Sequence, residues 1–107
     1  MKDIIDRCFK LDIYEKRSVT DDYCELVFHN KDNSEWESII TDFLGVAVKG
    51  PKAKPSKSDD LLTNEYGGIN VGQTLFKKEF KGFTIIAMFW PWGDGGHTTL
   101  KLIRLSK

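Results

Sequence analysis

The pattern of hydrophobic positions is clearest between residues 34 and 44, where it repeats with the period of an α-helix. Apolar residues recur there at intervals of three and four and so share one stripe: Trp36, Ile39, Ile40, Phe43 and Leu44. Ser34 and Glu37 have the spacing of a capping box, and Gly45 can adopt the left-handed conformation that ends a helix. The sequence therefore predicts one principal amphipathic helix over residues 34–44.

Alternation of apolar and polar residues predicts strands on either side of this helix. Successive side chains of a strand point to opposite faces of the sheet, so a strand that buries one face alternates between apolar and polar residues. The predicted strands are residues 9–14 and 23–29, joined as a hairpin, and residues 75–80, 83–90 and 98–105, joined as a meander. A short helix over residues 2–9 precedes them, and residues 46–48 are a candidate short strand.

These elements predict an α+β fold in the order ββα(β)βββ. We expect a two-layer sandwich, with a mainly antiparallel sheet of about five strands and the principal helix packed across one face. A chain of 107 residues fits a single α+β domain, residues 1–107. Residues 50–58 carry two prolines and several lysines with little to bury, so we expect an exposed loop there.

The middle strand of the meander is apolar on both sides. One side carries Phe83, Ile85, Ala87 and Phe89, and the other carries Ile86, Met88, Trp90 and Trp92. One helix of this length covers only one face of the sheet, and a bare second face would be a large apolar patch. We hypothesise that a second copy of the chain covers it, which predicts a homodimer. The alternative is that residues 2–9 or 61–69 fold back over this face.

The end of this strand is the candidate binding site. Met88, Trp90, Trp92 and His97 lie on it or beside the glycine-rich turn that follows it. Aromatic side chains in such a place can stack on sugars, bases or proline-rich peptides, but they more often fill a core or a subunit interface. The sequence thus favours a small, non-catalytic module that binds a protein or a small ligand and associates with itself.

Acid–base chemistry is the first alternative. Asp94, His97 and His29 are the candidates, because histidine titrates near neutral pH and a neighbouring carboxylate can orient it. However, turns favour aspartate for backbone reasons, and histidine commonly begins a strand. We therefore assign no catalytic residue, and a small enzyme using His97 with Asp94 remains an alternative.

Cysteines and glycines give no sign of a metal or a cofactor. Cys8, Cys24 and His29 match no zinc-site spacing. Both cysteines stand at positions of the apolar, core-facing pattern, which predicts buried thiols. The glycines between residues 67 and 72 do not have the spacing of a dinucleotide or phosphate-binding loop. We predict neither a metal site nor a cofactor.

Net charge argues against partners that are held by a long-range field. Sixteen basic residues balance sixteen acidic ones, so nothing draws the chain toward nucleic acid or an anionic membrane. A local nucleic-acid contact is a second alternative, through four lysines of residues 49–57: Lys49, Lys52, Lys54 and Lys57. Two acidic residues, Asp59 and Asp60, follow this segment at once and weaken the case.

Membrane and export signals are weak in this sequence. The most apolar stretch, residues 83–92, is about half of the roughly 20 residues that a spanning helix needs, and it contains Pro91. Charges interrupt the first residues before a signal-peptide core could form. We expect a cytoplasmic protein.

Overall fold

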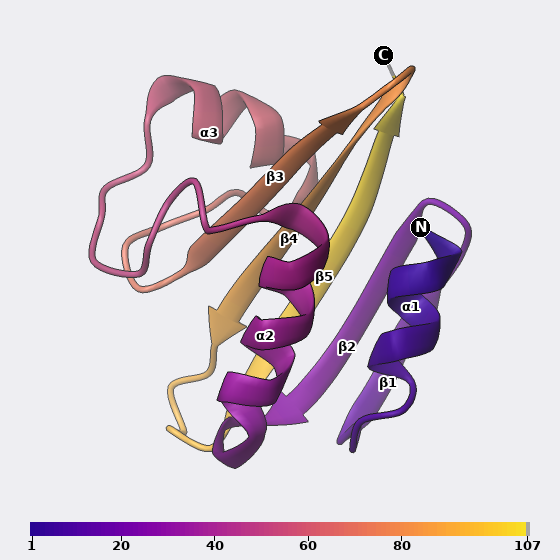
Figure 1. The fold of residues 1–107 in the computed structure, drawn as a ribbon. Helices are drawn as coiled ribbons and strands as arrows, with labels where there is room; N and C mark the ends of the chain where they lie inside the picture. Colours follow the sequence, from indigo (N-terminus) through magenta and orange to yellow (C-terminus); the bar gives the residue numbers. More distant parts are fainter. Residues whose placement is uncertain (107) are drawn as a thin grey trace.

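Five antiparallel strands form one sheet in the computed structural model, which describes residues 1–106 (Figure 1). In their order across the sheet, the strands are β1 (Glu15–Val19), β2 (Tyr23–His29), β5 (His97–Ser106), β4 (Phe83–Pro91) and β3 (Thr74–Phe80). Every neighbouring pair is antiparallel. The predicted α+β class is confirmed, and the predicted meander strands lie inside the observed ones.

The first strand is the main error of prediction in the N-terminal half. Residues 9–14 alternate in sequence but form no strand, and β1 begins only at Glu15. Leu11 and Ile13 instead pack against the core as part of a connecting segment, which accounts for the apolar positions that suggested a strand. β1 has little apolar pattern because it is an edge strand with mostly exposed side chains, and its register shifts between Lys16 and Ser18.

Two helices cover one face of the sheet, α1 (Lys2–Cys8) and α2 (Asn33–Leu44), and both cross in front of it in Figure 1. α2 begins after a 3₁₀ turn, η1 (Asn30–Asp32), and ends at Gly45, whose φ is 86°. The predicted stripe faces the sheet, with Trp36 stacked on Phe28 at 4.8 Å between ring centroids. The predicted capping box is wrong, because Asp32 is the N-cap and no side chain caps it.

A third helix, α3 (Lys57–Thr63), continues into a 3₁₀ turn, η2 (Asn64–Tyr66), and was not predicted. Its N-terminus is closed by a capping box between Ser56 and Asp59, so the predicted loop ends before residue 56. The helix is too short for a hydrophobic period to show in the sequence, and its apolar residues are the adjacent Leu61 and Leu62. In Figure 1 it lies apart from α1 and α2, next to β3.

The second face of the sheet is covered within the chain over β3 and β4. Leu62, Tyr66 and Ile69, from α3, η2 and the segment after them, pack against buried residues of the strands: Leu75, Ile86, Met88 and Ile103. The cover is therefore the fold-back of residues 61–69, which was the alternative to a second copy on this face. The homodimer stays a prediction, and this part of the sheet is not free to form it.

The segment after α2 contains a buried lysine instead of the candidate short strand. Residues 46–48 form no strand, and an isolated bridge joins Lys49 to Leu75 at the outer edge of β3. Lys49 Nζ donates hydrogen bonds to the carbonyl oxygens of Gln73 (2.6 Å) and Gly50 (2.9 Å), and burial lowers the pKa of this amine. Lys49 thus holds two loops together and does not belong to an exposed lysine patch.

Candidate functional site

Four aromatic rings gather on the second face of the sheet over β2 and β5. We call Tyr14, His29, Trp92 and His97 the aromatic cluster. The His97 ring is its centre, with centroids 4.2 Å from Tyr14, 5.0 Å from Trp92 and 5.2 Å from His29. Tyr14 also meets His29 edge-on at 5.2 Å. Edge-on and tilted arrangements at these distances are favourable for aromatic pairs.

The sheet register brings these residues together from four parts of the chain. His29 ends β2 and lies directly opposite His97, which begins β5. Trp92 follows β4 and is held by two hydrogen bonds, from its backbone N–H to the His97 carbonyl and from Nε1 to Thr99 Oγ1, both 2.8 Å. Tyr14 precedes β1 and donates its N–H to the Val27 carbonyl. Tyr14 is 51% exposed, so the cluster opens to solvent.

Asp94 orients the central histidine. One carboxylate oxygen lies 2.6 Å from His97 Nδ1, and the other accepts the backbone N–H groups of Gly96 (2.8 Å) and His97 (3.1 Å). The Gly96 N–H, followed by the His97 ring, lowers the pKa of Asp94 below its ordinary value. The aspartate therefore closes the turn before β5 and also fixes the His97 ring. Its two roles considered from the sequence, a turn residue and a carboxylate that orients histidine, both correspond to contacts in the structure.

One arginine and two glutamates flank the aromatic cluster. The Arg17 guanidinium lies over the Trp92 ring, 5.4 Å from its centroid. It bonds Glu15 at 2.9 Å and Glu25 at 3.4 Å, and Glu25 also accepts the Tyr23 hydroxyl at 2.6 Å. Sequence reasoning missed Tyr14 and Arg17 as site residues. Tyr14 ends the segment whose alternation predicted a strand, and Arg17 lies in a polar connection without a periodic pattern.

The four predicted binding residues do not form one site. Met88 is fully buried beneath the α3 cover. The Trp90 ring is half-buried and carries Lys101 Nζ 3.6 Å from its centroid, while the same amine donates to the Tyr66 carbonyl at 3.0 Å. Burial lowers the pKa of Lys101. Trp92 and His97, in contrast, are partly buried and belong to the aromatic cluster, which opens to solvent at Tyr14.

Both cysteines are buried in the core, as predicted, and neither forms a disulfide. Burial raises the pKa of the Cys8 thiol to about 12 and that of Cys24 to about 11, which keeps both protonated at neutral pH. Within residues 1–106, no three histidine, cysteine or acidic side chains are grouped so that they could hold a metal ion. No helix in the same part of the chain is long and apolar enough to cross a membrane.

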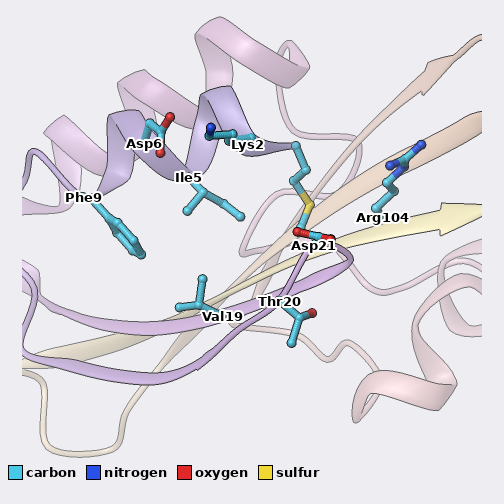
Figure 2. A pocket seen from close by; sticks show the side chains of 9 residues that line it. Lys2, Ile5, Asp6, Phe9, Val19, Thr20, Asp21 and Arg104 are labelled. Carbon is cyan, nitrogen blue, oxygen red and sulfur yellow. The ribbon is translucent and has the colours of Figure 1, made fainter.

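A groove of about 460 Å³ lies between α1 and the end of β1 (Figure 2). Ile5 of α1 and Phe9, which follows the helix, face Val19 of β1 across it. Charged side chains of both signs line the groove as well, namely Lys2, Asp6, Asp21 and Arg104. Because these charges balance, the groove favours neither anions nor cations.

Comparison of the chain with protein-family models, with curated proteins and with solved structures gives no significant match. Function is therefore argued from the geometry of the aromatic cluster and its surroundings.

Proposed function

We propose that this chain is a non-catalytic binding module that recognises a peptide segment of a protein partner through the aromatic cluster. The observation that carries the proposal is the group of contacting rings Tyr14, Trp92 and His97, with Arg17 beside it. Tyr14 is 51% exposed, and Trp92 and His97 are partly buried behind it. Tyrosine, tryptophan and arginine are the residues that contribute most often to the energetic centres of protein interfaces.

The chemistry around the cluster favours a peptide over the other ligands that aromatic rings can stack on. Glu15, Glu25 and Asp94 surround it, and their carboxylates would repel a phosphate backbone. Small-molecule sites are usually concave and largely apolar, whereas this one is an open sheet face with charged neighbours. An extended peptide can stack its side chains on the rings and use the carboxylates and the imidazoles as hydrogen-bond partners.

The test is selection from a displayed library of random peptides on the immobilised domain. Peptides that bind the wild type should lose at least tenfold in affinity for Tyr14→Ala, the size of effect expected from an interface centre. Val46→Ala is the matched control, because Val46 is an exposed apolar residue outside the cluster. Peptides that bind Tyr14→Ala and the wild type equally would place the binding site elsewhere and refute the proposal.

An enzyme using His97 with Asp94 is the second candidate, and the 2.6 Å contact between them favours it. This contact supplies an oriented imidazole, which is the first requirement of a general base. The side chains of His97 and Asp94 are 21% and 45% exposed, which is more open than the water-excluding sites in which such groups work. Hydrolysis of an activated ester that His97→Asn abolishes, while Tyr14→Ala leaves it unchanged, would favour the enzyme over the binding module.

A further inference from the structure

The outer edge of β3 is unpaired beyond Leu75 in the part of the chain that the structure describes, and its charges form a self-complementary pattern. β3 is the last strand of the sheet and pairs with β4 over its whole length without a register shift. The other edge, β1, has a register shift, which disfavours further pairing. Within the part of the chain described by the structure, β3 pairs on its outer side only at Leu75, through the bridge to Lys49.

The backbone of β3 shows which residues can pair outward. Leu75 directs its N–H and its carbonyl away from β4, because both bond to the segment that contains Lys49. Alternate residues of an antiparallel strand direct these groups to the same side, so Lys77 and Glu79 also present theirs outward. Their side chains are 38% and 63% exposed, and the two are joined only by a long ion pair of 3.9 Å.

We propose that β3 pairs with β3 of a second copy, antiparallel about a two-fold axis at Lys78, to form one sheet across a homodimer. This register places Lys77 opposite Glu79 of the second copy, and Glu79 opposite its Lys77. Each of these pairs exchanges both backbone hydrogen bonds and joins opposite charges. A two-fold axis at Lys77 would place Lys77 opposite its own counterpart, and an axis at Glu79 would do the same for Glu79, so like charges would meet. Either register would also leave one outward-facing residue without a partner.

Aromatic packing and lysine repulsion act in opposite directions on this dimer. Phe80 is half-buried, stacked on Phe83 at 5.0 Å, and comes opposite Phe76 of the second copy, which covers more of its ring. Exposed Lys78 meets its own counterpart at the axis, and like charges directly opposite one another disfavour pairing. The dimer is therefore weak and depends on concentration and salt. It does not involve the aromatic cluster, which lies over β2 and β5.

The experiment is sedimentation equilibrium from about 10 µM to about 1 mM, the range that covers weak interfaces. Lys77→Glu should weaken association about tenfold, because it replaces two attractive pairs by two repulsive ones. The double variant Lys77→Glu with Glu79→Lys restores both pairs and should bind within about twofold of the wild type. Lys78→Gln removes the repulsion at the axis and should strengthen association.

Lys52→Glu is the matched control, since it makes the same charge change on the exposed loop and should leave association unchanged. All four substitutions lie at exposed or half-exposed surface positions, and circular dichroism checks that each variant keeps the fold. A wild type that is monomeric at about 1 mM would overturn the proposal. Equal effects of Lys77→Glu and Lys52→Glu, or a double variant as weak as Lys77→Glu alone, would overturn it as well.

Discussion

Gly67 leaves the space that the indole of Trp90 occupies: a Cβ at position 67 would collide with the six-membered ring of that tryptophan. The backbone of Gly67 also has φ of 98°, a conformation that side chains disfavour. Because Gly67 follows η2 and Trp90 belongs to β4, this contact joins the α3 cover to the sheet.

Gly67→Ala should therefore lower the free energy of unfolding by about 2 to 4 kcal/mol, from the strained backbone and the clash together. Gly68→Ala is the matched control. Its φ is 79°, but no heavy atom lies within 4 Å of its Cβ position, so it should cost only about 1 kcal/mol. Urea unfolding of both variants measures the difference. Equal losses would mean that Trp90 moves aside freely and that the cover is loosely packed.

Ser56→Ala should destabilise the protein by about 1 kcal/mol, because Ser56 Oγ accepts the Asp59 N–H at 3.1 Å and caps α3. Ser58→Ala tests the same chemical change at an exposed position inside the helix and should alter stability by less than about 0.5 kcal/mol. Thermal unfolding of the two variants is the measurement. If Ser58→Ala cost as much as Ser56→Ala, the capping box would not be what starts this helix.

Stability should fall with rising pH above about pH 9 because of the buried Cys8 thiol. Burial, and then the nearby Cys24, raises its pKa from 9.0 in the unfolded chain to about 12 in the fold. Below pH 9 both states keep the proton, so this group contributes no pH dependence. Above pH 9 the unfolded state binds fewer protons than the folded state, and the loss reaches about 2 kcal/mol by about pH 10.5.

The check on this pH dependence is urea unfolding from about pH 7 to about pH 10.5 in the wild type and in Cys8→Ala. The variant is less stable at every pH because it leaves a small cavity, but its stability should decline less steeply on the alkaline side. Cys24, whose pKa is raised to about 11, accounts for part of the remaining decline. Parallel curves for the two proteins would show that Cys8 does not control the loss.

The neutral ring of His97 should carry its proton on Nδ1, because the Asp94 carboxylate accepts from that nitrogen. Asp94→Asn keeps an oxygen for the Gly96 N–H but turns an amide N–H₂ toward the ring, which should move the proton to Nε2. Imidazole ¹⁵N shifts report the tautomer directly, and His29 serves as an internal reference. An unchanged His97 spectrum in the variant would contradict the proposed role of Asp94 as the group that orients the ring.

Acid should weaken the same contact. The pKa of Asp94 is lowered in the fold, first by the Gly96 N–H and then by His97, so its contribution to stability is present above the ordinary value of 3.8. As the pH falls through the lower value in the fold, the folded state takes up the proton and that contribution is lost. The His97 resonances followed through this acid range should shift as the carboxylate is protonated.

The sequence by itself determined the elements whose information is local. The stripe from Trp36 to Leu44 repeats every turn of the helix. The meander strands are short runs of strand-forming residues with turn signals between them, so each pattern is complete within its own segment. Their antiparallel order in the C-terminal half followed from the short turns between them.

Only the tertiary structure decided what covers the second sheet face and where a site can form. α3 has too few apolar residues to show a period, and it is held over Met88 by contacts from distant parts of the chain, including Gly67 on Trp90 and Lys101 on the Tyr66 carbonyl. The aromatic cluster likewise joins Tyr14 to His97, which are 83 positions apart in the sequence (97 − 14). Contacts of this kind depend on the register of β2 against β5, and no local pattern in a single sequence encodes that register.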